Sequence, residues 1–324
     1  MRLYAAGFNA WNQLQFRTWD KAESQDDTPD CEGSEPSDIY PFSCILESEK
    51  LGAIQPFLTF TTLTTAKGQL LAGAVPEPFN SGHDDYNYAE AMNGRVVVYD
   101  GAGSIYQYSS VADYYRRNES ELQRTVFKRP SDIIQTVAYD TGFAALTSTG
   151  QVWTWGDGRF PECLCRSVTE ESPADRPGCA TCLEDLPTGP IVKIAAGGYV
   201  LTALTSGRDL YAWGGYPGRQ PVLEGLTGDP VPIVVVMESE DSSDDADIDI
   251  VDVGVGEEHM IVLMADGTVC AIGSNSNGQL GLDPDQRAAA SSWVRVPIPL
   301  LSDEHVVDVV AGPRSSFVLV DKKA

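Results

Sequence analysis

The sequence of 324 residues predicts an all-β fold, a closed β-propeller of about six blades. Three observations support this prediction. A strand–turn–strand unit recurs along the chain, its spacing is nearly constant, and a split copy joins the two ends. Such units bury both faces of each sheet when they pack radially, and closing the ring leaves only short exposed edges. Internal repetition therefore decides the fold before local propensities do.

Three copies of the unit align without gaps, and each ends in a glycine. They are FAALTSTGQVWTWG (143–156), LTALTSGRDLYAWG (201–214) and MIVLMADGTVCAIG (260–273). The closing glycines at 156, 214 and 273 are 58 and 59 residues apart. Two weaker copies precede them, at 57–73 and 96–109. Alternating β-branched and aromatic residues around a Thr-Gly or Asp-Gly turn predict two strands in each unit.

A further copy is divided between the two ends of the chain. GSNSNGQLGL (273–282) corresponds to GFNAWNQLQF (7–16), and VAGPRSSFVLVD (310–321) corresponds to the segment around 255–265. Counted around a ring, Gly7 is position 331, another 58 residues after Gly273. The C-terminus therefore carries the first half of a repeat and the N-terminus carries the second half. We expect the N-terminal strand to complete the last blade.

The pattern G-x-N-x-x-G-Q-L-G, following a strand–turn–strand that ends in Y/W-x-W-G, resembles the RCC1 repeat (regulator of chromosome condensation). The resemblance covers four units well and the two upstream units loosely. It implies an RCC1-like propeller, similar in character to small RCC1-domain proteins such as the partner of a JmjC-type oxygenase or the fungal alpha-tubulin suppressor type. Seven blades, the usual number in RCC1 itself, would require a degenerate unit between residues 17 and 50.

Several positions depart from the family pattern. Asn12 and Gln15 replace glycines, Ser109 stands where a glycine is expected, and Tyr139 replaces the glycine before an inner strand. His259 matches the family's recurrent histidine, and we expect it to be a structural residue hydrogen-bonded at the start of a strand. The corresponding positions in other units are Gly142, Val200 and Ser315.

We predict a single domain over residues 1–324 with three irregular segments. Two are acidic loop insertions, at 20–50 and 238–249, and the third is a cysteine-containing loop at 160–186. Ser, Pro, Gly and acidic residues dominate the two acidic segments, which favours solvated loops over strands. A helix is predicted over residues 111–124, where Ser109 or Ser110 could cap it. It carries the basic pair Arg116 and Arg117.

The net charge of −25 limits the possible partners. Nucleic-acid binding requires a basic surface, so direct contact with DNA or RNA is not expected. A basic protein partner would be attracted at long range. No stretch approaches the roughly 20 apolar residues of a membrane span. The N-terminus lacks a secretory signal pattern. We therefore expect a monomeric intracellular propeller, cytoplasmic or nuclear, without membrane contact.

Four of the seven cysteines cluster between the third and fourth units: Cys163, Cys165, Cys179 and Cys182. Paired thiolates at this spacing can bind zinc tetrahedrally. Cys-x-Cys is less usual than Cys-x-x-Cys in zinc sites, and Pro-rich, Asp-rich sequence surrounds the cluster. Incidental thiols, a zinc site and a redox pair are therefore all left open, and we assign no metal ligand.

The sequence shows no recognisable set of catalytic residues. The three histidines, His83, His259 and His305, lie in separate contexts, and neither a G-x-S-x-G nor an H-E-x-x-H motif occurs. The alternation of Trp153, Trp155 and Trp213 with small residues favours core packing over a ligand cage. We expect no enzyme activity and no cofactor.

The sequence therefore supports two functions. The first is a non-enzymatic scaffold for protein–protein interaction, in complexes related to chromatin, tubulin or tRNA modification. The alternative is guanine-nucleotide exchange on a Ran-type small GTPase, which the resemblance to RCC1 implies. Only blade-forming motifs match the family here, so no exchange residue can be assigned.

Overall fold

The computed structural model describes residues 1–16, 36–75, 88–116, 124–216, 221–226, 228–237 and 249–323. These residues form six β-sheets, five of four strands and one of three, together with short helices. They divide into two compact units, which are described separately. The first unit holds the described residues of Met1–Asp84 and Glu258–Ala324, and the second holds those of Asp85–Glu238 and Asp244–Glu257.

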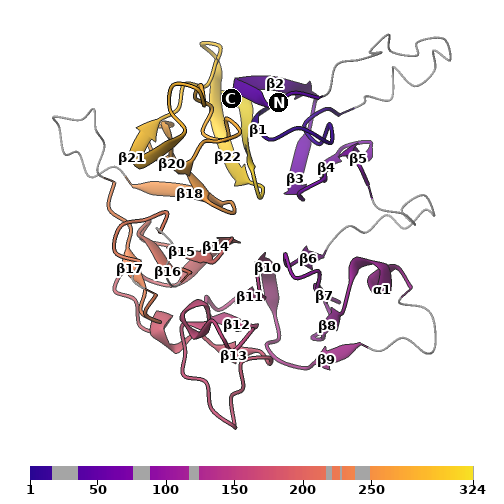
Figure 1. Cartoon of the computed structure of the whole chain (residues 1–324), viewed down its shortest axis with the longest axis vertical. Helices are drawn as coiled ribbons and strands as arrows, with labels where there is room; N and C mark the ends of the chain where they lie inside the picture. Colours follow the sequence, from indigo (N-terminus) through magenta and orange to yellow (C-terminus); the bar gives the residue numbers. More distant parts are fainter. Residues whose placement is uncertain are drawn as a thin grey trace. The chain divides into compact units, whose positions relative to one another are not determined.

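The two ends of the chain meet in one sheet of the first unit (Figure 1), whose strand order is β2-β1-β23-β22. β1 pairs antiparallel with β23 through six residue pairs, from Arg2 opposite Val320 to Gly7 opposite Ser315. The prediction that the N-terminal strand completes the last blade is confirmed. The four strands are β1 (Arg2–Gly7), β2 (Ile39–Glu47), β22 (Glu304–Ala311) and β23 (Ser315–Lys322).

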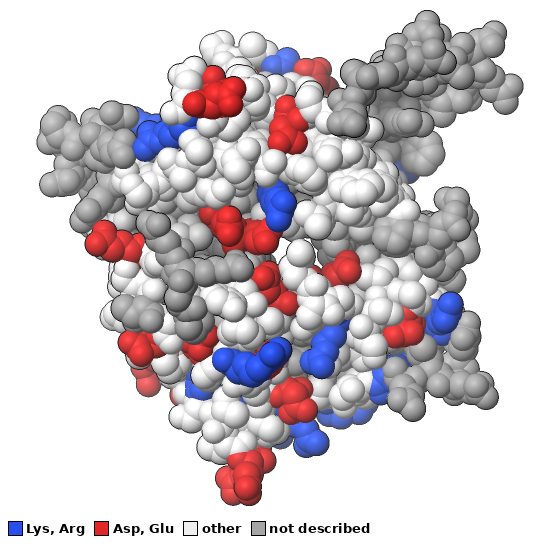
Figure 2. All heavy atoms as spheres, in the orientation of Figure 1, with Lys and Arg blue, Asp and Glu red and all other residues white. Residues whose placement is uncertain are grey.

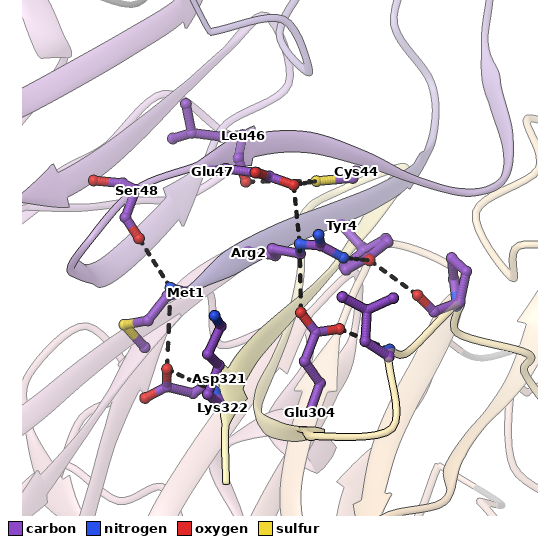
Figure 3. Close-up of polar contacts among 12 residues, drawn as sticks. Met1, Arg2, Tyr4, Cys44, Leu46, Glu47, Ser48, Glu304, Asp321 and Lys322 are labelled. Carbon is purple, nitrogen blue, oxygen red and sulfur yellow. Dashed lines mark hydrogen bonds and ion pairs between the residues drawn. The ribbon is translucent and has the colours of Figure 1, made fainter. Parts of the chain in front are cut away.

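Polar contacts reinforce this junction (Figure 3). The Arg2 guanidinium lies between two carboxylates, with its Nε 2.9 Å from Glu47 Oε1 and 3.4 Å from Glu304 Oε1. The N-terminal amine donates to the Ser48 carbonyl at 2.9 Å. Because Glu304 is nearly buried, its charge would be costly without the arginine. The N-terminal strand therefore supplies an ion-pair partner to the C-terminal sheet as well as hydrogen bonds.

The predicted loop at 20–50 is wrong for residues 39–47, which form the outer strand β2. Phe42 and Leu46 are buried on it, and β2 pairs with β1. The acidic composition ends at Asp38, and the following segment IYPFSCILE has strand composition that the acidic residues before it obscured. Residues 36–50 therefore complete an existing sheet and do not add a seventh unit. Residues 17–35 lie outside the described part of the chain.

The remaining strands of the first unit include the hairpin predicted at 57–73. Buried residues of β19 and β20 pack with β23 in one cluster that includes Ile261, Ala271 and Val318. A second cluster joins Leu3 and Phe317 to Leu63. The strands are β3 (Leu51–Pro56), β4 (Phe60–Thr65), β5 (Gly68–Gly73), β19 (His259–Met264), β20 (Val269–Ser274) and β21 (Ala289–Arg295).

The second unit contains three four-stranded sheets, in which β6 to β9, β10 to β13 and β14 to β17 follow each other in chain order, and strand β18. The bounds are β6 (Ala89–Glu90), β7 (Val96–Tyr99), β8 (Ile105–Tyr108), β9 (Thr125–Phe127), β10 (Ile133–Tyr139), β11 (Gly142–Thr147), β12 (Val152–Gly156), β13 (Gly178–Cys179), β14 (Ile191–Gly197), β15 (Val200–Thr205), β16 (Leu210–Gly214), β17 (Ile233–Val234) and β18 (Ile250–Val255).

The predicted helix is present but shorter in the described residues. α1 spans Val111–Tyr115, and Ser110 caps it by accepting a hydrogen bond from the Asp113 amide at 3.1 Å. Arg116 is exposed at its C-terminal end, whereas Arg117 lies outside the described residues. Two 3-10 helices, η2 (Pro161–Leu164) and η3 (Thr181–Leu183), lie in the loop between β12 and β14.

The two copies of the asparagine–glutamine motif fold alike. Asn275 Oδ1 accepts from the Leu280 amide at 2.9 Å, and Asn9 Oδ1 accepts from the Leu14 amide at 3.0 Å. Gln279 and Gln13 each accept a backbone N–H two residues earlier, both at 2.9 Å. The chain reverses direction in each motif, so these backbone N–H groups do not pair within a sheet. The side-chain oxygens of the asparagine and the glutamine accept hydrogen bonds from them instead.

Asn12 occupies the position of Gly278 in this motif. Both residues have positive φ, 57° and 77° respectively, and asparagine tolerates this conformation better than most residues. Asp38 connects the two copies, because its Oδ1 accepts from the Asn9 amide at 3.0 Å and its Oδ2 from Asn277 Nδ2 at 2.8 Å. Asp38, within the segment predicted as an acidic loop, is therefore a structural bridge.

Tyr139 corresponds to Gly256 of another unit, and Gly142 corresponds to His259. The large and the small side chain have therefore changed places. Tyr139 and Gly142 face each other across β10 and β11, and a Cβ built on Gly142 would lie 2.4 Å from the Tyr139 hydroxyl. The tyrosine ring, 2% exposed, occupies the space that a histidine from the neighbouring strand would fill. The departure from the family pattern is therefore a paired exchange that keeps the volume filled.

Deleting residues 1–16 tests the junction. We expect the truncated chain to lose at least about 5 kcal/mol of unfolding free energy, because Leu3, Tyr4 and Leu14 each contribute about 1.5–3 kcal/mol by burial and β23 loses its partner. Urea unfolding measures this loss. A truncated chain with the midpoint of the full chain would show that β1 does not complete the sheet.

Candidate functional site

The described residues contain no group of three or more His, Cys, Asp or Glu side chains placed to hold a metal ion. Within the same residues, no helix is long and apolar enough to cross a bilayer. His83, a histidine considered from the sequence, lies outside the described part of the chain. The candidate features of the described residues are therefore the cysteine-containing loop, the buried histidine and the contacts between successive strands.

The structure separates the four clustered cysteines, all of which are free thiols. Cys165 and Cys182 lie together, with sulfur atoms 3.9 and 2.8 Å from the carbonyl oxygen of Pro230. Cys163 instead faces the Tyr199 carbonyl at 3.5 Å, and Cys179 lies 3.3 Å from Glu184 Oε1. The tetrahedral zinc arrangement considered from the sequence is therefore not formed by these residues.

Burial makes three of these thiols, those of Cys163, Cys165 and Cys179, poor nucleophiles. It raises the pKa of Cys179 to about 11 and raises the pKa of Cys163 and Cys165 further. Only the thiolate is strongly nucleophilic, so these side chains are largely unreactive at neutral pH. Their placement favours the interpretation as packing residues of the loop.

Arg166 organises the loop around these cysteines, and the sequence analysis did not single it out. Its side chain is almost fully buried, and its guanidinium donates to the backbone carbonyls of Thr154, Ser172, Pro173 and Arg176 and to the Ser172 hydroxyl. Only arginine presents enough donors in one plane to satisfy so many acceptors. Its position directly after Cys165 was the only signal in the sequence.

Three aromatic rings pack together beside this loop. The centroids of Tyr199 and Tyr216 are 4.8 Å apart, and Phe160 lies 4.9 and 5.7 Å from them. Arg159 stacks over Phe160 and pairs with Asp157 at 2.6 Å, which lowers the pKa of that carboxyl. Because the rings touch one another, the cluster leaves no space for a ligand between them. It presents an exposed tyrosine and an exposed arginine to solvent.

Trp155 and Trp213 lie in the core, as the sequence predicted, whereas Trp153 is half-buried. Trp155 and Trp213 are buried, and their indole N–H groups donate to Gln107 Oε1 and the Cys163 carbonyl, each at 3.0 Å. His259 is also buried at the start of β19, with Nε2 2.9 Å from the Ser316 hydroxyl. Its predicted structural role is confirmed. His305 lies within β22, the strand before β23, and is exposed.

Polar side chains at one repeated position connect β10 with β14 and β14 with β18. Gln135 makes two hydrogen bonds with the backbone of Ile194, at 2.7 and 2.9 Å, and Lys193 pairs with Asp252. Each pair spans 59 residues, one repeat. Gly197 also permits close approach, since a Cβ there would lie 2.4 Å from the Gly256 carbonyl oxygen. These contacts set the spacing of neighbouring strands.

The architecture and these repeated contacts define a β-propeller protein. Models of the Regulator of chromosome condensation (RCC1) repeat match residues 266–319 and 250–279. Human E3 ubiquitin-protein ligase HERC2 is 29% identical over 184 residues, covering 55% of this chain and 3% of HERC2. The chain is therefore an RCC1-like propeller protein, and it aligns with only a small part of this curated relative.

Solved structures agree with this assignment. The crystal structure of human WBSCR16 has a TM-score of 0.57 at 18% identity, covering 98% of this chain and 82% of that one. Prp20p from Saccharomyces cerevisiae, described with its binding to Gsp1p and histones, has a TM-score of 0.55 at 16% identity and covers 85% and 69%. At these identities the likeness establishes the fold.

Replacing Arg166 with lysine tests its role in the loop. We expect a loss of about 2 kcal/mol or more, because lysine leaves several buried carbonyls unpaired. Arg159→Lys is the matched control, since that side chain is exposed and should change stability by less than about 0.5 kcal/mol. Limited proteolysis should cut the Arg166→Lys variant within residues 157–186. Equal stability of the two variants would contradict the assigned role.

His259 predicts a loss of stability in acid. Burial lowers its pKa from 6.5 to about 4, so below pH 6.5 the unfolded chain binds a proton that the folded chain does not. The unfolding free energy should therefore fall by about 2 kcal/mol from pH 7 to pH 5 through this group. His259→Asn should flatten that part of the profile, whereas His305→Asn, at an exposed position, should not. An unchanged slope in His259→Asn would contradict this account.

Proposed function

We propose that the chain is a non-enzymatic scaffold of the RCC1-like type that binds another protein inside the cell. One observation supports this proposal: the candidate reactive groups of the propeller make contacts within the fold. The thiols donate to carbonyl or carboxylate oxygens, and His259 is buried against Ser316. Cys179 and Glu184 line a hollow together, but burial raises the pKa of that thiol to about 11, which leaves it largely unreactive at neutral pH.

Charge supports a basic protein as the partner. Counted along the sequence, 18 of the 47 acidic and 4 of the 22 basic residues fall outside the described segments, which accounts for −14 of the net −25. Figure 2 shows both signs of charge on the described surface that it views. The acidic segment 238–249 falls outside the described residues except for Asp249. Its composition would accelerate association with a basic partner.

The chromatin, tubulin and tRNA-modification settings remain alternatives for this scaffold, and so do the cytoplasm and the nucleus. The free thiols are consistent with a reducing compartment. We propose that the chain acts as a monomer, without direct binding to nucleic acid, a membrane or a cofactor.

Affinity purification of the tagged full chain with quantitative mass spectrometry tests the scaffold proposal. We expect a stoichiometric partner whose recovery falls when the six carboxylates from Glu238 to Asp247 are replaced with Asn or Gln. The loss should be greatest at low salt, because the attraction is screened at high ionic strength. Thermal stability should stay nearly unchanged in this variant. Repeated failure to recover any stoichiometric partner would contradict the proposal.

Guanine-nucleotide exchange is the second candidate, because the structurally similar Prp20p is described as binding Gsp1p. A nucleotide-release assay with a Ran-type GTPase separates the two functions. The scaffold proposal predicts release at the spontaneous rate. Acceleration well above that rate would favour exchange.

A further inference from the structure

One exposed apolar residue recurs at the same position of three strands in the second unit, each of which is the first strand of its sheet. These residues are Ile134 on β10, Val192 on β14 and Val251 on β18, with exposed fractions of 61%, 50% and 36%. They are 58 and 59 residues apart, the spacing of the repeat. A single exposed valine needs no explanation, but these three lie at one repeat position on strands that contact each other in sequence, β10 with β14 and β14 with β18.

β-Bulges cause this exposure at Ile134 and Val192. Ile133 pairs with Thr147 and Gln135 with Leu146, so Ile134 has no opposite residue. The same shift leaves Val192 unpaired between Ile191 and Lys193. An extra residue of this kind turns its side chain away from the sheet. The next residues, Gln135 and Lys193, hold the neighbouring strand, so the row keeps a fixed spacing.

A hollow of about 430 Å³ lies at the start of β14. Gly150, Cys179, Leu183 and Ile191 are among the residues that line it, and Val192 follows Ile191 directly. Its volume lies in the range of sites that accept a small molecule or a side chain of a partner. Leu183 and Ile191 are apolar, and both are buried.

The rim of the hollow and the strand starts are acidic. Within 132–135, 148–151, 184–193, 206–209 and 249–252 there are six acidic residues and two basic ones. Both basic residues are paired, Lys193 with Asp252 and Arg208 with Asp249. Neither Glu184 nor Asp185, which line the hollow, forms an ion pair with another described residue. Their negative charge is therefore available to a partner.

The aromatic cluster does not share this character. The exposed charge there is Arg159, which stacks on Phe160 and neutralises Asp157. A basic partner would meet a positive side chain at that cluster and negative ones at the hollow. For a basic partner, charge complementarity therefore favours the row and the hollow over the aromatic cluster.

We propose that this surface binds an extended polypeptide segment in which apolar side chains alternate with Lys or Arg. We call it the bulge face: Ile134, Val192, Val251 and the hollow beside Val192. The apolar side chains of the partner cover the row and enter the hollow, while its basic side chains lie against Glu184 and Asp185. The inference rests on the proposed scaffold function and names its binding surface and the chemistry of its partner.

Three fluorescent peptides test the inference by anisotropy with the full chain: GKLKVKLKG, GELEVELEG and GKSKSKSKG. We expect the first to bind at least about tenfold more tightly than the others, because only it supplies both apolar contact and positive charge. Equal binding of GKSKSKSKG would show attraction to net charge alone and would overturn the inference. Undetectable binding of GKLKVKLKG up to about 1 mM, the weak limit of specific association, would also overturn it.

Variants locate the binding. Ile134→Ser and Val192→Ser should each weaken GKLKVKLKG by about fivefold to tenfold, since each removes an apolar contact that the complex buries. Val168→Ser is the matched control, because Val168 is 42% exposed but is not part of the row and does not line the hollow. Circular dichroism establishes that all three variants are folded. Equal weakening by Val168→Ser, or no effect of the first two, would contradict the bulge face.

Cross-linking separates this inference from the scaffold proposal. A GKLKVKLKG peptide with photo-leucine should cross-link to residues within 132–135, 149–151 or 183–193, mapped by mass spectrometry. Cross-links confined to other surfaces would overturn the bulge face. They would leave the scaffold proposal intact, which fails only if the full chain has no stoichiometric protein partner in cells.

Discussion

The antiparallel pairing of β1 with β23 is the constraint on which the first unit depends. The pairing buries Leu3, Tyr4 and Phe317 and places the positive charge of Arg2 beside the buried carboxylate of Glu304. Asp38 then joins the two copies of the asparagine–glutamine motif. Residues more than 200 positions apart in the sequence therefore stabilise one sheet, and the cost of bringing them together is offset by burial and paired charges.

The repeated strands were predictable because their signals are local and recur. The Thr-Gly and Asp-Gly turns, the alternating strands and the GSNSNGQLGL motif each identify a unit without tertiary information. β2 was missed because acidic composition up to Asp38 obscured the strand that follows it. Tyr139 looked like a defect, and only the structure shows that Gly142 compensates for it. Such exchanges depend on which residues face each other, and one sequence does not reveal that.

The candidate site was less predictable, for a physical reason. The spacing of Cys163, Cys165, Cys179 and Cys182 is compatible with zinc binding, but loop geometry decides where the thiols point. Arg166 fixes that geometry by donating hydrogen bonds to four backbone carbonyls. A sequence does not show which backbone carbonyls will accept such bonds. The bulged residues Ile134 and Val192 look like ordinary core positions of a strand. Their exposure depends on a one-residue shift in register.

Hydrogen–deuterium exchange of the full chain tests the central claim most directly. If β1 is an integral strand of the sheet, amides of Leu3–Ala6 and Phe317–Val320 should exchange together, through the same opening that exposes β22. Their protection should match that of β19 and β20, because core strands exchange only through large-scale unfolding. Exchange of the β1 amides many-fold faster than those of β19 would show that the N-terminal strand is peripheral and would contradict the account.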